Sequence, residues 1–159
     1  MLGVYLAAGW FNPEQRKQMD EIYEVLNQLR IENKIKLFSP FYDGIVLKKD
    51  DPNLKEKMKL VWDLDIKKVM ESDLIVASTQ DHDVGTIFEC GYASAFDKTI
   101  FCYNSNPELG LNVMLAQEAK AFCKSKTQLR CAVIDFIHFL NSGEYIEKYR
   151  YNLFEGDPI

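Results

Sequence analysis

The sequence predicts a single α/β domain: a doubly wound, flavodoxin-like or Rossmann-like sheet of about five mainly parallel strands flanked by helices. Two observations predict this fold class. Short, continuous apolar runs alternate along the chain with longer segments in which apolar residues recur at helical spacing. Apolar runs of this kind are typical of parallel strands that helices cover on both faces. The length of 159 residues suits one domain with its own core.

Five apolar runs are the expected strands, and turn-forming residues or polar loops follow them. They are residues 3–8, 35–40, 74–78, 99–103 and 121–123. In open sheets of this type, ligands bind in the crevice at the carboxyl ends of the strands. The loops after these runs are therefore the first place to look for a functional site.

Amphipathic segments separate the strands and are the expected helices. They are residues 13–31, 54–72, 84–96, 112–118 and 126–140. The first has the clearest start, because Asn12 suits the N-cap, Pro13 the first helical position and Gln15 the third. The last has an apolar face that is expected to point inward: Leu129, Val133, Phe136, Ile137 and Leu140.

The helix expected at 54–72 carries a carboxylate on its apolar stripe. The other stripe residues are Leu54, Met58, Val61, Trp62 and Val69. Asp65 belongs to the same stripe by spacing, and an inward carboxylate is costly unless it is hydrogen-bonded or reaches a polar site. Asp65 is thus either the solvent-facing edge of the stripe or a functional acid. The preceding loop, residues 41–53, is either a binding loop or a surface excursion.

Residues 83–93 follow the third strand and a polar loop. Asp83 is a good N-cap for a helix, and Glu89 lies one to two turns into it, so both carboxylates face the expected crevice. Gly85 would let a ligand or a neighbouring backbone come close. The apolar positions that indicate the helix are Val84, Ile87, Phe88 and Ala95. The simpler alternative is that Asp83 is only a cap and Glu89 only a solvated residue.

An aromatic pair follows the first strand. Trp10 and Phe11 are either ordinary packing residues or a platform for a flat ring at the mouth of the crevice. Aromatic residues also mark the C-terminal tail, residues 143–159, which is expected to pack at the site or at a subunit interface.

Composition excludes several functions. A net charge of −5 without a Lys/Arg cluster argues against a nucleic acid or an anionic membrane as partner. The four cysteines are widely spaced and are expected mainly as buried free thiols. The two histidines form no ligand cluster, and no glycine-rich phosphate motif is present, so neither a metal nor another cofactor is expected. The chain starts without a basic leader region and no apolar run approaches a membrane span, so a cytoplasmic protein is expected.

Five pieces of the chain, in order and over essentially its whole length, resemble the nucleoside 2-deoxyribosyltransferase family. They are residues 5–11, 63–65, 83–93, 112–114 and 151–156. The resemblance implies transfer of a 2-deoxyribosyl group between nucleobases by double displacement with retention, in nucleoside salvage. It also implies a 2′-deoxynucleoside and a free purine or pyrimidine base as partners, and a homo-oligomer, a hexamer built from dimers.

The resemblance assigns four catalytic roles. Glu89 is the nucleophile that forms the glycosyl-enzyme, Tyr5 orients it, Asp83 protonates the departing base, and Asp65 is a second carboxylate on the base side. The implied substrate-binding residues are Gly9, Trp10, Phe11, Gly85, Asn112 and Met114. In the family, the last two hold the sugar partly across a subunit interface.

The chemistry of these residue types agrees with the roles. A C–N glycosidic bond breaks through an oxocarbenium-like transition state, which a carboxylate can stabilise or trap covalently. A leaving purine is a poor anion, so a positioned acid must give it a proton. Carboxyl groups that share a partly dry pocket repel, which keeps one of them protonated near neutrality.

The chain departs from the family in two places. No glutamine that would contact the base is found after Pro40, where Tyr42 and Asp43 stand instead, so base selectivity stays open. The chain also ends at Ile159 without a terminal tyrosine.

Two other functions stay open. One is an N-glycoside hydrolase of nucleosides or of nucleoside 5′-monophosphates. Relatives that act on the phosphates carry a serine where this chain has Asp83, and a carboxylate there repels phosphate. The other is a non-catalytic nucleoside-binding module, which would hold nucleoside without releasing base.

Overall fold

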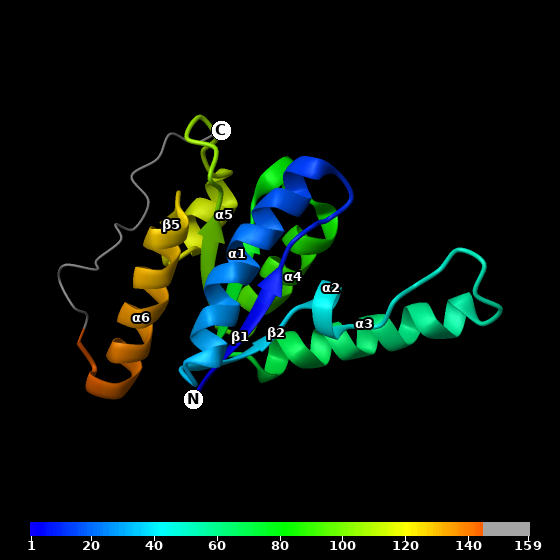
Figure 1. The fold of residues 1–159 in the computed structure, drawn as a ribbon, viewed down its shortest axis with the longest axis horizontal. Coiled ribbons are helices and arrows are strands. Elements are labelled where there is room, and N and C mark those ends of the chain that lie inside the picture. The colour runs from blue at the N-terminus through cyan, green and yellow to red at the C-terminus, as the bar shows by residue number, and fades with distance from the viewer. Residues whose placement is uncertain (145–159) are drawn as a thin grey trace.

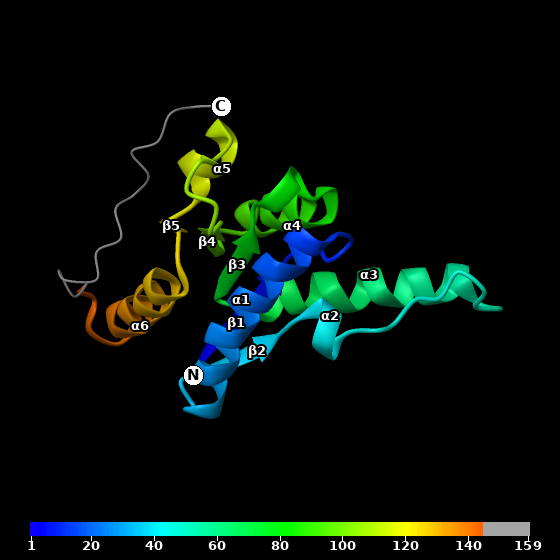
Figure 2. The same cartoon turned by 45° about the horizontal axis from the view of Figure 1, so that its top comes forward.

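A five-stranded sheet lies between two layers of helices in the computed structural model, which describes residues 1–144 (Figures 1 and 2). The strands follow the spatial order β2-β1-β3-β4-β5, and every neighbouring pair is parallel. The strands are β1 (Leu2–Ala7), β2 (Ile35–Phe38), β3 (Leu74–Ser78), β4 (Thr99–Tyr103) and β5 (Ala121–Cys123). This is the doubly wound α/β fold that the sequence predicts.

The helices connect the strands in sequence. They are α1 (Pro13–Ile31), α2 (Pro40–Asp43), α3 (Leu54–Glu71), the 3₁₀ turn η1 (Gln80–His82), α4 (Val84–Ser94), α5 (Val113–Glu118) and α6 (Lys126–Ser142). Side chains alternate across the sheet. Leu6 and Val76 pack with α1 and α6 on one face, whereas Tyr5 and Ile75 pack with α3, α4 and α5 on the other.

The start of α1 forms as its sequence predicts. Gln15 donates its backbone N–H to the side-chain Oδ1 of Asn12 at 2.9 Å, so Asn12 is the N-cap. The Gln15 side chain turns back and accepts the N–H of Phe11 at 3.0 Å. This second bond fixes the loop that leads from β1 into α1.

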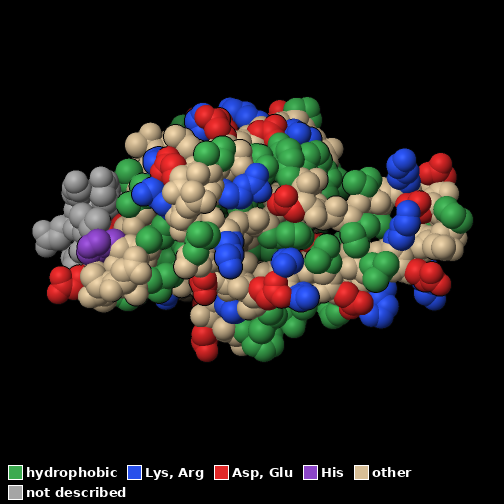
Figure 3. All heavy atoms as spheres, turned by 60° about the horizontal axis from the view of Figure 1, so that its bottom comes forward, with side chains coloured by type: hydrophobic (Ala, Val, Ile, Leu, Met, Phe, Trp, Pro, Cys, Tyr) green, Lys and Arg blue, Asp and Glu red, His purple; other side chains and the backbone are tan. Residues whose placement is uncertain are grey.

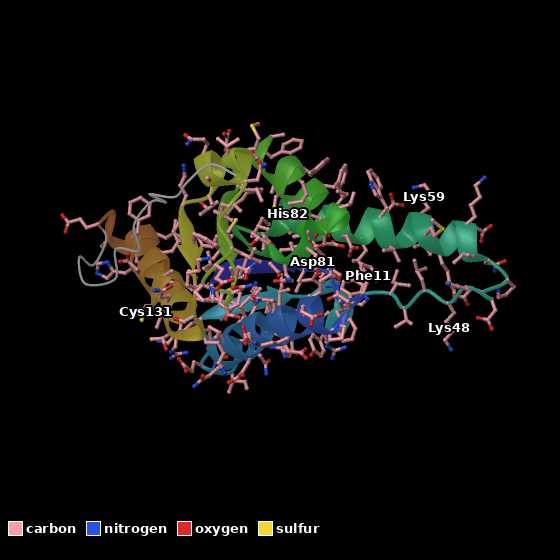
Figure 4. All side chains as sticks on the ribbon, turned by 90° about the horizontal axis from the view of Figure 1, so that it is seen from above. Phe11, Lys48, Lys59, Asp81, His82 and Cys131 are labelled. Carbon is pink, nitrogen blue, oxygen red and sulfur yellow. The ribbon has the colours of Figure 1, made fainter. Side chains whose placement is uncertain are left out.

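The expectation that the apolar stripe of α3 points inward is wrong for the single chain. Only Val69 is buried, whereas Met58 and Trp62 are 55% and 53% exposed. The reason is geometric: only the C-terminal part of α3 reaches β1 and α4, and the rest projects away from the sheet (Figures 1 and 2). The projecting end carries both signs of charge with apolar side chains between them (Figure 3, right). Lys48 and Lys59 mark this end in Figure 4.

Two of the apolar residues whose spacing indicates α4 are exposed to solvent. Val84 and Phe88 are 82% and 52% exposed, and the sheet-facing positions are Thr86, Cys90 and Ala93. Small residues on that face let α4 pack closely against β3 and β4. Likewise Leu140 is 52% exposed, because the last turn of α6 extends past the short strand β5.

The segment expected as a loop after β2 begins with a helical turn, α2. Pro40 occupies the first helical position, and Asp43 accepts the backbone N–H of Ser39 at 2.9 Å. Proline favours such a start because its fixed φ suits the first turn. The free cysteines are as expected: Cys90, Cys102 and Cys123 are buried.

Within residues 1–144, no helix is long and apolar enough to cross a membrane. The aromatic part of the expected C-terminal tail begins at Tyr145 and lies outside the described residues.

Candidate functional site

The site lies where the strand order reverses. β1 has β2 on one side and β3 on the other, so the connections that follow β1 and β3 leave in opposite directions. Such a switch point opens a crevice at the carboxyl ends of the two strands. The loop 8–12 forms one wall of this crevice and the loop 79–83 forms the other.

A tyrosine and a glutamate meet beside this crevice. The Tyr5 hydroxyl, from β1, donates to Oε1 of Glu89, from α4, at 2.5 Å. The Tyr5 side chain is fully buried, and its ring stacks on Phe38 of β2 at 5.8 Å. Burial and the charge of Glu89 raise the pKa of Tyr5 far above its usual range, so its hydroxyl stays a donor. Tyr5 thus holds Glu89 in one orientation.

Two further carboxyl groups act on Glu89. Burial raises the pKa of Glu89 to about 8, the hydrogen bond from Tyr5 lowers it, and the charges of Asp65 and Asp83 raise it. Asp65 comes from the inner part of α3, where burial raises its pKa to about 6. Three carboxyl groups, one from α3, one from the start of α4 and one from within α4, therefore share one site, and their proximity together with burial favours the protonated form of Glu89 near neutrality.

Asp83 is held rigidly and sits against a glycine. It is the N-cap of α4, and its Oδ2 accepts the backbone N–H and the hydroxyl of Thr86, both at 2.9 Å. A Cβ on Gly9 would lie 2.9 Å from Cγ of Asp83 and equally close to the Gln15 side chain. A Cβ on Gly85 would come to 3.3 Å from Oδ2 of Asp83. Gly9 and Gly85 therefore border the carboxyl group of Asp83, as close-approach positions.

Aromatic rings line the entrance beside Gly9. Trp10 and Phe11 are 36% and 73% exposed, and their rings lie 5.2 Å apart. Phe41, from α2, meets Trp10 edge-on at 5.5 Å, and the guanidinium of Arg16 covers Phe41 at 4.1 Å. These rings offer a flat ligand an apolar wall. Sequence reasoning missed Phe41, and the available signal was its place directly after the carboxyl end of β2.

Tyr42 and Asp43, which follow Pro40, make contacts outside this cluster. The Tyr42 hydroxyl donates to Asp20 of α1 at 2.8 Å, and its ring stacks on Tyr23 at 3.8 Å. Asp43 serves the start of α2, as described above.

The two predicted sugar-binding residues do not join this cluster in the single chain. Asn112 and Met114 border a groove of about 780 Å³ between α4 and α5, together with Ile87 and Gly91. Each of these α4 residues is two positions from Glu89, a rotation of about 200° around the helix. The groove and Glu89 therefore lie on different sides of α4.

Four of the predicted catalytic residues, Tyr5, Asp65, Asp83 and Glu89, are thus brought together, with Gly9, Gly85 and the aromatic pair beside them. Within residues 1–144, no group of three or more His, Cys, Asp or Glu side chains is arranged to hold a metal ion. The arrangement offers an oriented glutamate, two neighbouring carboxyl groups and a wall for a flat ring.

Comparison with known proteins agrees with the family resemblance of the sequence. Residues 4–139 match the family profile described as nucleoside 2-deoxyribosyltransferase. A 2-deoxyribosyltransferase from the psychrotolerant bacterium Bacillus psychrosaccharolyticus has a similar structure, with a TM-score of 0.66 and 22% identity over 80% of this chain and 89% of that one.

A conserved protein from Enterococcus faecalis V583 is also similar, with a TM-score of 0.56 and 17% identity over 91% of this chain and 99% of that one. No curated protein matches. At these identities the solved structures support the fold, whereas the profile covers most of the chain. The chain therefore belongs to the nucleoside 2-deoxyribosyltransferase family.

Proposed function

We propose that this protein transfers the 2-deoxyribosyl group of a 2′-deoxynucleoside to a free purine or pyrimidine base, in nucleoside salvage. The observation that carries the proposal is the 2.5 Å hydrogen bond from Tyr5 to Glu89 within a cluster of three carboxyl groups. A carboxylate that is held in one orientation and partly removed from water is suited to nucleophilic attack.

In the first step, the Glu89 carboxylate attacks C1′ of the sugar while the C1′–N bond breaks. The electron pair of that bond leaves with the base, which takes a proton from Asp83. Asp83 is the better placed donor because Gly9 leaves it open to the crevice beside the aromatic wall. Asp65, with a pKa near 6, is the second carboxyl group on this side.

In the second step, a nitrogen of the incoming base attacks C1′ and returns its proton to Asp83. The ester bond between C1′ and Glu89 breaks, and Glu89 is free again. Each displacement inverts C1′, so two of them retain the configuration. Attack on C1′ by the incoming base competes with attack by water at this stage. The aromatic rings of Trp10 and Phe41 favour a stacked base over water.

We further propose that a second copy of the chain completes the site. Asn112 and Met114 lie on the other side of α4 from Glu89, so a sugar bound at Glu89 would need these residues from a neighbour. The exposed stripe of α3 and the exposed residues Val84 and Phe88 of α4 supply apolar surface for that contact. A projecting helix such as α3 gains most of its stability from packing.

A complementation experiment tests the shared site. Glu89→Gln and Asn112→Ala variants are expected to be inactive alone. When subunits are exchanged, pairs that share two sites recover activity in about a quarter of the sites, because one site of each mixed pair has both intact residues. If mixing restores nothing although subunits exchange, each chain builds its own site.

The transfer assay tests the proposed reaction. Deoxyinosine with adenine, and separately thymidine with adenine, are incubated with the protein and the products are separated by chromatography. Formation of deoxyadenosine that disappears in Glu89→Gln supports transfer, and the thymidine arm defines whether pyrimidine donors are used. Free base without a new nucleoside would instead indicate a hydrolase, and nucleoside 5′-monophosphates would then be tested. Nucleoside bound without any turnover would indicate a binding module.

A further inference from the structure

We infer that Asp81 is a positioning residue for the proton donor Asp83. The hydrogen bond that Asp81 accepts from Asn12, here called the clasp, crosses the crevice and keeps Asp83 in place. The inference rests on the proposed function, because it concerns the acid that would protonate the departing base. Asp81 lies in the β3–α4 loop and Asn12 in the β1–α1 loop, so the clasp spans the two walls of the switch point. Figure 4 labels Asp81 and His82 from the first of these loops, and Phe11, which precedes Asn12 in the sequence, from the second.

The clasp is a polar contact with both partners fixed. Asn12 donates from Nδ2 to Oδ2 of Asp81 at 2.8 Å, while its own Oδ1 caps α1 through Gln15 N. Oδ1 of Asp81 accepts from Nε2 of Gln80 at 2.7 Å. Because Asn12 is anchored to the start of α1, Asp81 is tied to the body of the domain and not merely to its own loop.

The backbone of this loop needs such a tie. Asp81 and His82 have φ of 58° and 49°, two consecutive residues in the left-handed region. Residues other than glycine adopt this region at an energetic cost and keep it only where surrounding contacts hold it. The next residue is Asp83, which turns the chain into α4 with φ −49° and ψ 124°.

The position of Asp83 therefore depends on the left-handed turn before it. Its Oδ2 accepts the N–H of Thr86 at 2.9 Å, and its Cγ would lie only 2.9 Å from a Cβ added to Gly9. The Asp83 side chain therefore has little freedom to move between Thr86 and Gly9. When the clasp is lost, the turn relaxes and Asp83 leaves the position from which it caps α4 and faces the crevice.

Four substitutions separate the clasp from the backbone strain. Asp81→Gly suits the positive φ but removes the clasp, whereas Asp81→Asn suits the same φ and keeps an acceptor for Asn12. Asn12→Ser keeps a good N-cap for α1 but removes the donor of the clasp. The matched control is Asp97→Gly. Asp97 also has a positive φ, 55°, but it precedes β4 and so lies at the amino ends of the strands, opposite the crevice.

Two readouts are measured on the full chain. The first is amide hydrogen exchange at Thr86, whose N–H is held by Asp83. The second is the split between kcat and KM for deoxyinosine with adenine. Asp81→Gly and Asn12→Ser are expected to speed exchange at Thr86 about ten-fold and to lower kcat about ten-fold, part of the 10²–10⁴-fold that a general acid contributes. KM is expected to change little.

The double variant is expected to be no worse than either single one, because both remove the same contact. Asp81→Asn and Asp97→Gly are expected to match the wild type in both readouts. The inference is overturned if Asp81→Gly leaves exchange at Thr86 and kcat at wild-type values, or if Asp97→Gly causes the same losses. If the wild type shows no transfer at all, the proposed function fails, while the exchange measurement still decides whether the clasp positions Asp83.

Discussion

Replacing Tyr5 by phenylalanine removes one hydroxyl from the site and leaves its packing in place. The ring stays stacked on Phe38 and surrounded by the buried side chains of the inner sheet face. The hydrogen bond of 2.5 Å to Glu89 is lost, and with it the one contact that lowers the pKa of Glu89. The burial and neighbouring carboxyl groups that raise this pKa remain.

The size of the effect follows from that bond. A hydrogen bond to a charged group is worth about 1.5–3 kcal/mol, which corresponds to a rise of about 1–2 in the pKa of Glu89. With a pKa of about 8 in the wild type, about a tenth of Glu89 is ionised at pH 7. In the variant this fraction falls to roughly 1% or less, so kcat/KM at pH 7 is expected to fall by about 10–100-fold.

The assay is the pH dependence of kcat/KM for deoxyinosine with adenine. The rise of kcat/KM with pH, which reports ionisation of the carboxyl cluster in the free enzyme, is expected to move to higher pH in Tyr5→Phe. The loss relative to wild type therefore shrinks as the pH increases. An unshifted profile, or a loss of equal size at every pH, would refute the idea that Tyr5 acts by favouring the ionised form of Glu89.

Other consequences follow from the same geometry. The pKa of Glu89 is raised in the folded protein, which therefore binds more protons than the unfolded chain between about 4.5 and about 8, so stability falls as the pH rises through this range. Glu89→Gln is expected to remove that dependence and to stabilise the protein at pH 8 by up to about 4 kcal/mol in denaturant titrations. Gly9→Ala is expected to lower kcat at least ten-fold by displacing Asp83, with the folded state intact by circular dichroism; unchanged turnover would contradict the close approach. Asp83→Asn is expected to lose roughly 100-fold on deoxyinosine but far less on a donor whose base already carries a positive charge, such as 2′-deoxy-7-methylguanosine; equal losses would mean that Asp83 is not the acid.

The strands could be predicted from the sequence, because strand formation and helix starts depend on local patterns. Continuous apolar runs have few alternatives to buried parallel strands, and the N-cap signals at Asn12 and Asp83 act within one helical turn. The carboxyl ends of parallel strands meet at one edge, which predicts that Asp83 and Glu89 face the same crevice. Tyr5 is assigned to this place only by the resemblance to the family.

The burial of helix side chains could not be predicted, because it depends on what lies opposite each helix. The spacing of Met58 and Trp62 indicates an apolar stripe, but spacing does not reveal that α3 extends beyond the sheet. On α4, the small residues Cys90 and Ala93 face the sheet, and the larger Phe88 faces outward. The left-handed turn at Asp81 could not be predicted from the sequence, because the residues that form it include no glycine to mark a positive φ.

Trapping the covalent intermediate tests the account most directly. The protein is incubated with deoxyinosine without an acceptor base, quenched in acid, digested and examined by mass spectrometry. One deoxyribosyl group is expected on the peptide that contains Glu89, and none in Glu89→Gln. Addition of adenine before the quench is expected to remove the group and release deoxyadenosine. A deoxyribosyl group on another residue, or transfer that continues in Glu89→Gln, would contradict the role of Glu89 as nucleophile.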